Sequence, residues 1–230
     1  MVFGKIDYIN LLPFHIFLKQ SSLSSSFKKS CERQKSFPSN INKKFRKRLV
    51  DAAFISSIES QKKSIKPLNI GIVAKKKVNS VIIKEGVTKK DPASATSNVL
   101  AKVLGIQGEV FIGDRALKLY LKNPQEYIDL GEEWHHRFNL PFVFARFCIN
   151  SNSQFYTKLA QRFQKKRIKI PTYILQNYAH ERGIAPQEIK NYLKLISYTI
   201  GKKEQKGLKL FFKKAKQLKA PSGLKTSSLH

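Results

Sequence analysis

The chain has 230 residues and a formal net charge of +29, from 44 Lys and Arg against 15 Asp and Glu. Hydrophobic residues make up 41% of it, which is enough to build a core and excludes disorder over the whole chain. The two cysteines, Cys31 and Cys148, form no C-x-x-C motif. This excludes a disulfide framework and a cysteine-type zinc site, and it fits a reducing compartment.

The positive charge is concentrated at the two ends of the chain. Residues 1–83 carry a net charge of +13 and residues 151–230 carry +15, whereas residues 84–150 carry only +1. A basic excess is typical of proteins that bind nucleic acid, so nucleic-acid binding is one candidate function. The near-neutral middle segment shows that the excess is not a property of the whole chain.

The N-terminal segment lacks the features of a secretory signal. Asp7 and Asn10 interrupt the apolar stretch there. Nowhere does a run reach the roughly 18 apolar residues that a membrane-spanning helix needs. We therefore expect a soluble cytoplasmic protein.

The first third of the chain is expected to mix short strands and helices. Runs rich in β-branched and aromatic residues predict strands at 3–9, 51–55, 68–74 and 78–84. Helices are predicted at 14–18, 27–34 and 41–49, with a polar loop at 21–26.

The middle third alternates strands and helices, and the last third is predicted to be all helical. Strands are predicted at 109–112, 127–130 and 141–149, and helices at 94–104, 114–121 and 131–138. This alternation is typical of α/β proteins and favours mainly parallel pairing. Further helices are predicted at 153–167, 172–182, 186–196 and 202–218, followed by a loose tail at 221–230. The helix at 202–218 has an apolar face, which packing explains more simply than nucleic-acid binding does.

Several kinds of chemistry have no motif in this sequence. It holds neither G-x-S-x-G nor G-x-x-x-x-G-K-[ST], which disfavours an α/β serine hydrolase and a P-loop enzyme. The run Glu132–His136 contains residue types that can bind a metal. Adjacent histidines on a helix point about 100° apart, however, so the two do not converge on one ion. A helix start with Glu near its positive end explains the run better, so we expect no metal.

Three segments share the design of a strand, a polar turn and a helix start: Phe54–Ser57, Ser94–Ser97 and Phe111–Asp114. The free N–H groups and hydroxyls of such turns can hold a carboxylate or phosphate, although plain helix capping is the alternative. Asp114 would repel an anion, so capping or orienting a neighbour suits it better. The candidate ligand contacts are Ser56, Ser57, Thr96, Ser97 and Asp114.

Five blocks of sequence occur in the order of a known family's motifs: Gly4–Pro13, Asp51–Glu59, Ser94–Ser97, Ile112–Leu117, and Asp129–His135 continued by Leu140–Ala145. Together they resemble the chorismate dehydratase family of the futalosine route to menaquinone. The resemblance implies an α/β, two-lobed type II periplasmic-binding-protein-like fold with a helical C-terminal part. Lobe one would hold residues 1–82 and 146–230, lobe two residues 83–145, and the ligand cleft would lie between them.

The resemblance also implies a reaction. Water is lost from chorismate, a dicarboxylate, to give 3-[(1-carboxyvinyl)oxy]benzoate, with no metal or organic cofactor. The substrate's own enolpyruvyl carboxylate can serve as the base. Asn10 is expected near the reacting ring, either as donor to the departing hydroxyl or as a residue that orients the substrate. Tyr8 is expected in the pocket wall, with the serines and Thr96 anchoring carboxylates. The alternatives are a turn residue for Asn10 and core packing for Tyr8.

The chain also departs from this family. It is shorter between Glu59 and Leu68, and the segment Ser21–Lys35 is unusually basic. Because a shared fold does not determine function, a non-catalytic protein that binds a small anion stays open as the alternative. Nucleic-acid binding is the less favoured second alternative.

Overall fold

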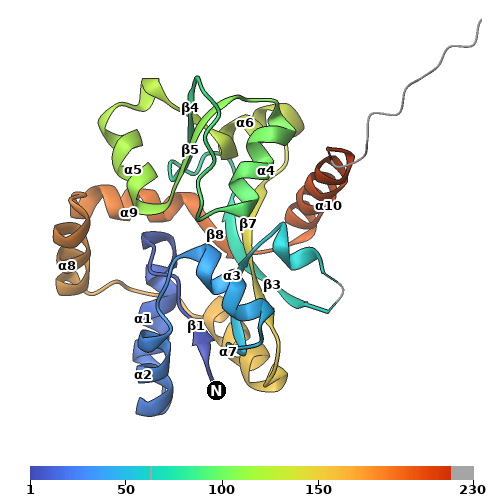
Figure 1. The fold of residues 1–230 in the computed structure, drawn as a ribbon. Helices are drawn as coiled ribbons and strands as arrows, with labels where there is room; N and C mark the ends of the chain where they lie inside the picture. The colour runs from blue at the N-terminus through green and yellow to red at the C-terminus, as the bar shows by residue number, and fades with distance from the viewer. Residues whose placement is uncertain (63, 219–230) are drawn as a thin grey trace, which may run out of the picture.

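The computed structural model describes residues 1–62 and 64–218, and the tail expected at 221–230 lies outside them. Figure 1 shows two groups of strands with helices around them. The larger sheet has the order β1-β2-β7-β3-β8 and the smaller one β5-β4-β6. Their bounds are β1 Phe3–Gly4, β2 Ala52–Ser56, β7 Phe142–Ile149, β3 Lys66–Ala74, β8 Ile196–Thr199, β5 Gly108–Ile112, β4 Val81–Glu85 and β6 Ile128–Asp129. The chain leaves the larger sheet after β3, builds the smaller one, and returns along β7.

The helices fall into three groups along the chain. Between the first strands lie α1 Leu12–Gln20, α2 Ser25–Arg33 and α3 Pro38–Arg46. The helices α4 Ala95–Leu104, α5 Gly113–Lys122 and α6 Leu130–Phe138 accompany the smaller sheet in the upper part of Figure 1. The last group is α7 Ser153–Lys165, α8 Thr172–Arg182, α9 Pro186–Leu195 and α10 Lys202–Gln217. Short 3-10 helices lie at Ile9–Leu11, Glu59–Gln61 and Pro124–Glu126.

The predicted helices are confirmed, but two predictions about strands are wrong. The first strand covers only Phe3–Gly4, because the chain turns into the 3-10 helix at Ile9. The last third is not all helical, since β8 follows α9 directly and pairs with β3. Ile196–Thr199 lies at the end of the predicted helix 186–196 and in the gap before the one at 202–218, and it pairs with the edge of the larger sheet along β3.

The expectation of mainly parallel pairing is also wrong. Only β1 and β2 pair in parallel among the strand pairs of the described residues, while β7 runs antiparallel to both β2 and β3. In the smaller sheet, β4 runs antiparallel to β5 and to β6. The alternation of strands and helices along the chain does not determine whether a strand lies parallel or antiparallel to its neighbours. Here β7 follows the smaller sheet in the chain and lies between β2 and β3, two strands that precede that sheet.

Aromatic side chains fill the core of the larger sheet. Phe147 on β7 packs edge-on against Phe54 on β2, with ring centroids 5.2 Å apart. Phe14 of α1 contacts both rings and also meets Phe163 of α7 at 5.0 Å. These contacts bury one face of the sheet and fasten the start of α1 to it, which positions the short segment that precedes α1.

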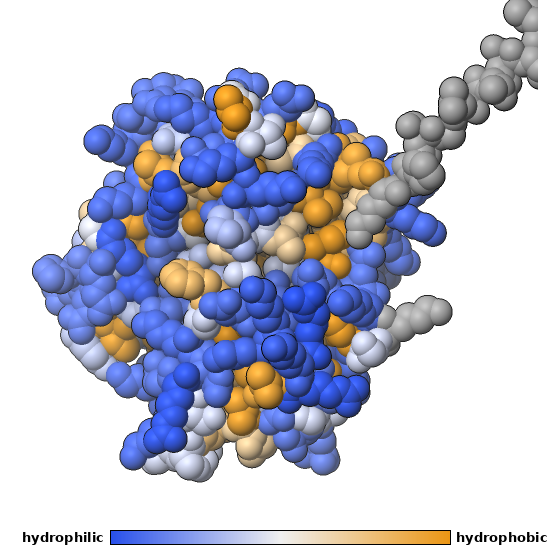
Figure 2. Space-filling model, in the orientation of Figure 1, coloured by the Kyte–Doolittle hydropathy of each residue, from blue (hydrophilic) through white to orange (hydrophobic). Residues whose placement is uncertain are grey.

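A second aromatic cluster joins α6, β7 and α10. Phe142 lies 5.2 Å from Trp134 and 4.9 Å from Phe211, between ring centroids. Phe211 and Ala215 of α10 are buried, while its lysines at 202, 203, 206, 209, 213 and 216 are exposed. The apolar face of this helix is therefore used in packing, as expected. Figure 2 shows a correspondingly hydrophilic face of the molecule, with apolar residues in separate groups.

Both cysteines are free and buried. Within the described ranges, no three His, Cys, Asp or Glu side chains come together in a way that could hold a metal ion. In the same part of the chain, none of the helices is both long and apolar enough to span a bilayer.

Candidate functional site

A small cavity of about 70 Å³ lies where strands of the two sheets end. The larger sheet contributes Ser56 from the end of β2, together with Phe144 and Ala145 of β7. The other wall comes from the starts of α4 and α5, through Ser97 and Gly113. Tyr8 and Asn10 complete the lining. Four of the residues predicted from sequence thus meet in one place: Tyr8, Asn10, Ser56 and Ser97.

Asn10 is held from two sides by tyrosines of the C-terminal third. It lies in the 3-10 helix Ile9–Leu11, and the Tyr198 hydroxyl donates to its backbone carbonyl at 2.6 Å. Burial raises the pKa of Tyr192, while hydrogen bonds with Ser80 and with the Asn10 side chain oppose that rise. The hydroxyls of Tyr192 and Ser80 lie 2.8 Å apart. Asn10 is half-buried, and its side chain lies next to the buried pair of Tyr192 and Ser80 at the cavity wall.

Tyr8 presents a protonated hydroxyl at physiological pH. Burial raises the pKa of its phenol, and the nearby charges of Asp91 and Asp114 raise it further. Its half-buried ring packs against the backbone of Gly113, which has a φ of +68°. A phenol in this state can donate a hydrogen bond but does not act as a strong base.

The start of α4 offers donors for an anion. Ser94 caps the helix, its hydroxyl oxygen accepting from the Ser97 N–H at 3.1 Å and its hydroxyl donating to Ser97 Oγ at 2.7 Å. The first turn of α4 contains no acidic residue, and the nearest carboxylate before it, that of Asp91, accepts from the Ala93 N–H at 2.7 Å. Ser94 and Ser97 both line the cavity. A carboxylate in the cavity would meet this helix start.

Ser56 is oriented by Asn42. The Asn42 amide donates to Ser56 Oγ at 3.0 Å, and its carbonyl oxygen accepts from the Ser56 N–H at 3.3 Å. Because the Ser56 oxygen accepts in this pair, its own hydroxyl proton is free to donate. The serine is thus held as a donor at the end of β2.

Ser57 and Thr96 do not line the cavity, although sequence predicts them as ligand contacts. The Ser57 hydroxyl donates to the Val143 carbonyl at 2.6 Å, and Thr96 Oγ1 accepts from the Ile58 N–H at 3.2 Å. Both side chains are buried. They fasten the loop after β2 to β7 and to α4.

Asp114 also lies off the cavity, where it orients the Tyr8–Asn10 segment. One carboxylate oxygen accepts from the Ile9 N–H at 2.9 Å and the other from Arg182 Nε at 2.7 Å. Burial raises the pKa of Asp114, and the bonds from Ile9 and Arg182 only partly offset this. This placement matches the orienting role that its charge suggests.

Arg182 also forms an ion pair with a second carboxylate, that of Asp7. Its Nη2 lies 3.0 Å from Asp7 Oδ2. Burial alone would raise the pKa of Asp7, but Lys35, with Arg182, lowers it below its ordinary value. The two carboxylates therefore shift in opposite directions around one cation, because Asp114 is more deeply buried and Asp7 has Lys35 beside it.

Sequence reasoning missed Ser80, Arg146, Arg182, Tyr192 and Tyr198. Tyr192 falls inside a predicted helix, Tyr198 falls between two predicted helices, and Arg182 is the last residue before the helix-ending Gly183. Arg146 is half-buried on β7 and forms no ion pair among the described residues; its Nη1 reaches Ser60 Oγ at 3.4 Å. Burial lowers its pKa. No local motif marks these side chains, because their partners lie far away in the chain.

Two α/β sheets, with a cavity between their strand ends that apolar side chains and a few hydroxyl and amide groups line, define a protein of the periplasmic-binding-protein-like class. Solved structures share this fold. A protein of Archaeoglobus fulgidus aligns with a TM-score of 0.69 at 11% identity, covering 94% of this chain and 97% of that one. An ABC transporter protein of Parabacteroides distasonis gives 0.55 at 13% identity, covering 94% and 92%. A Candida albicans protein described as having the generic periplasmic binding protein fold gives 0.51 at 11%, covering 92% and 89%. The expected fold is confirmed.

Sequence comparison identifies the family. Residues 97–217 match a family model described as menaquinone biosynthesis. The chain is 50% identical over 220 residues to chorismate dehydratase of Campylobacter jejuni subsp. jejuni serotype O:23/36 (strain 81-176), covering 95% of this chain and 99% of that protein. The chain belongs to this menaquinone biosynthesis family, as its motifs indicate.

Proposed function

We propose that the chain is a hydro-lyase that dehydrates chorismate to 3-[(1-carboxyvinyl)oxy]benzoate. The observation that carries this proposal is the 50% identity to a chorismate dehydratase along nearly the whole length of both proteins. The cavity at Asn10 supports it independently, because its donors suit a small substrate with more than one carboxylate.

The reaction depends more on how the substrate is positioned than on strongly acidic or basic side chains. A base takes the proton from C3 of the ring, the C3–H electron pair forms the new ring double bond, and the C4 hydroxyl leaves with a proton as water. The product ring is aromatic, which drives the step. The protein must then hold the substrate in one orientation and exclude solvent.

Four of the residues that line the cavity have a role in this scheme. Asn10, held by Tyr192 and Tyr198, donates to the departing hydroxyl. Tyr8 lines the pocket as a neutral donor, while Ser97 and Ser56 anchor the carboxylates with the N-terminus of α4. The side chains that line the cavity, among the described residues, include no carboxylate, imidazole or amine. In the scheme that the family resemblance implies, the substrate's own enolpyruvyl carboxylate takes the C3 proton, so no side-chain base is needed.

The proposed lobes are residues 1–82 with 146–230, and residues 83–145. A cavity of about 70 Å³ is small beside the roughly 300 Å³ of typical small-molecule sites, so the substrate enters when the lobes separate. The contacts that must open include the Ile9–Asp114 and Ile58–Thr96 hydrogen bonds and the ion pair between Arg182 and Asp114. We also propose a cytoplasmic location, which the two free buried thiols suit.

Chorismate consumption by the purified protein, followed by absorbance and mass, tests the function. Asn10→Ala should lower turnover by about a hundredfold or more, as for loss of one donor to a developing charge, and should stay folded. Asn191→Ala, on the exposed side of α9, is the matched control and should keep full activity. Recovery of intact chorismate from a stable complex would instead favour the anion-binding alternative. Full activity in Asn10→Ala would overturn the role of Asn10.

A further inference from the structure

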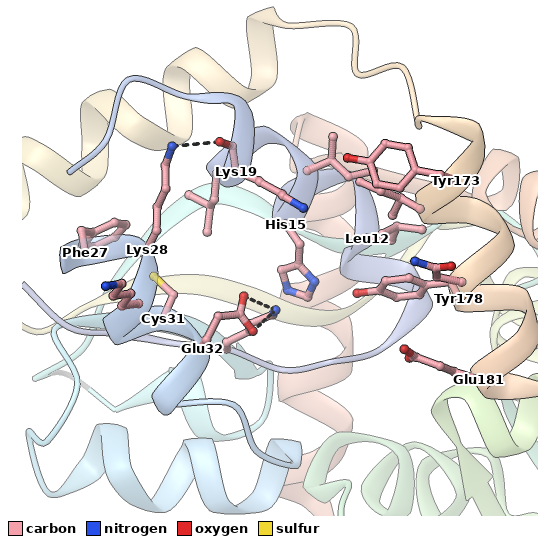
Figure 3. A pocket seen from close by; sticks show the side chains of 16 residues that line it. Leu12, His15, Lys19, Phe27, Lys28, Cys31, Glu32, Tyr173, Tyr178 and Glu181 are labelled. Carbon is pink, nitrogen blue, oxygen red and sulfur yellow. Dashed lines mark hydrogen bonds and ion pairs between the residues drawn. The ribbon is translucent and has the colours of Figure 1, made fainter. Parts of the chain in front are cut away.

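A second cavity, of about 550 Å³, lies between α1, α2 and α8, and the function proposed above makes no use of it (Figure 3). Its volume is within the range of about 300–1000 Å³ found for small-molecule sites. One wall is the helix α2, which carries Lys28, Lys29 and Arg33 against one acid, Glu32. This helix contributes Phe27, Lys28, Lys29, Cys31 and Glu32 to the lining.

The cavity has an apolar lining. Leu12 of α1 lies beside Tyr173 and Tyr178 of α8, and Phe27 of α2 closes the end opposite α8 (Figure 3). Ile16 of α1 also lines the cavity. Tyr173 is an exposed large side chain, with 58% of its surface accessible. An apolar body of matching size would bury this surface on binding.

The charges around the cavity are unbalanced in favour of cations. Lys19, Lys28 and Lys29 line it, and none of the three forms an ion pair with an acidic side chain within residues 1–62 and 64–218. The Lys28 ammonium donates only to the Lys19 carbonyl, at 2.9 Å. The two acids of the lining are already paired, Glu32 with Lys5 at 2.6 Å and Glu181 with Arg182 at 2.8 Å. Three positive charges thus stand beside an apolar cavity without counter-charges.

His15 supplies an independent sign of a ligand. Figure 3 shows its ring hanging from α1 between Glu32 of α2 and Tyr178 of α8. Both ring nitrogens are buried, and neither has a hydrogen-bond partner within the described part of the protein. Burial lowers the pKa of His15 to about 3, with the charge of Lys5 adding to the effect, so the ring is neutral with one donor and one acceptor. Buried polar groups without partners are rare in proteins, and a small shift of the ring would let a ligand satisfy one nitrogen.

We propose that the cavity between α1, α2 and α8 binds a small amphipathic organic anion, one acidic group on an apolar body. The body packs between Ile16, Phe27 and Tyr173, and the acidic group lies against Lys28 and Lys29. The proposal goes beyond the dehydratase function and does not rest on it, because binding here is measured without chorismate.

Octanoate and 1-octanol, which share a chain and differ in charge, are the probes. Titration calorimetry on the full chain should give a dissociation constant at least about tenfold lower for octanoate, a difference of about 1.4 kcal/mol. In an NMR titration, octanoate should shift the His15 ring signals. Equal affinity for the alcohol, no measurable binding of octanoate, or unmoved His15 signals would each overturn the proposal.

A charge-reversal pair locates the site. Lys28→Glu with Lys29→Glu should weaken octanoate binding at least about tenfold. Lys213→Glu with Lys216→Glu, at exposed positions of α10, changes the net charge equally and should leave binding unchanged. Equal weakening by both pairs would show that the overall charge, not this cavity, attracts the anion. Circular dichroism melts of both double variants confirm that they fold.

Discussion

Replacing Gly113 by alanine changes the backbone and the cavity wall together. Gly113 has a φ of +68°, in the left-handed region. A Cβ there would lie 2.6 Å from Tyr8 Cζ and 2.8 Å from Cε1 and Cε2. Gly105, at the end of α4, provides a matched control, because its φ is +66° and nothing lies within 4 Å of an added Cβ. The pair of variants separates backbone strain from displacement of Tyr8.

The two effects differ in size. A left-handed alanine costs roughly 1–2 kcal/mol, so both variants should melt about 2–8 °C lower than the wild type. In Gly113→Ala alone, the Tyr8 ring must also retreat by about 0.6–0.8 Å for its contacts to return to 3.4 Å. Misplacement of a site group by about 1 Å can cost a hundredfold in rate, so kcat/KM should fall by about tenfold to a hundredfold.

Thermal unfolding and chorismate consumption are measured for both variants below their melting temperatures. Gly105→Ala should keep its activity, and Gly113→Ala should lose it while remaining folded. If the two variants are equally active, the position of Tyr8 does not matter to the reaction and the proposed pocket wall is wrong. If Gly113→Ala melts like the wild type, the left-handed strain has been overestimated.

Three further variants test the surroundings of the site. Arg182→Ala leaves two carboxylates without their shared cation, so urea unfolding should show a loss of about 3 kcal/mol; no measurable loss would contradict this network. Ser57→Ala should lower the free energy of unfolding by about 1–2 kcal/mol and leave kcat/KM unchanged. Ser97→Ala should raise KM for chorismate. The opposite result, with KM raised only in Ser57→Ala, would show that Ser57 and not Ser97 contacts the substrate. Since the pKa of His15 falls from 6.5 to about 3 on folding, the unfolded chain binds a proton between those pH values that the folded chain does not. Stability should fall as the pH drops from 6.5 to 3, by up to about 1.4 kcal/mol per pH unit. His15→Leu should flatten this dependence, and an equally steep slope in that variant would count against the effect.

Local signals in the sequence predicted the helices well. Ser94 caps α4 as its position predicts, because a cap depends on residues three positions apart. Pro186 likewise begins α9. Pairing directions and β8 were not predictable in this way, since they depend on which strand lies alongside after the chain has folded.

The candidate site was predictable in part. The motif containing Tyr8 and Asn10, and the polar turns of Ser56 and Ser97, converge on one cavity. Ser57 follows Ser56 directly but hydrogen-bonds to β7, because successive side chains of an extended chain point to opposite sides. Sequence alone did not show which of the two adjacent serines lines the cavity.

Patterns along the chain were enough to predict the family, the α/β class, the order of most elements and the residues around which a site could form. These predictions rest on short-range periodicity, capping and motif order. The folded molecule was needed to show that Arg182 and Tyr198 hold the Tyr8–Asn10 segment, and that the basic helix α2 forms one wall of a second cavity, which His15 also lines. The groups in these contacts are far apart along the chain, since Tyr198 is 188 positions from Asn10 and Arg182 is 68 from Asp114. Folding alone brings these groups within hydrogen-bond reach.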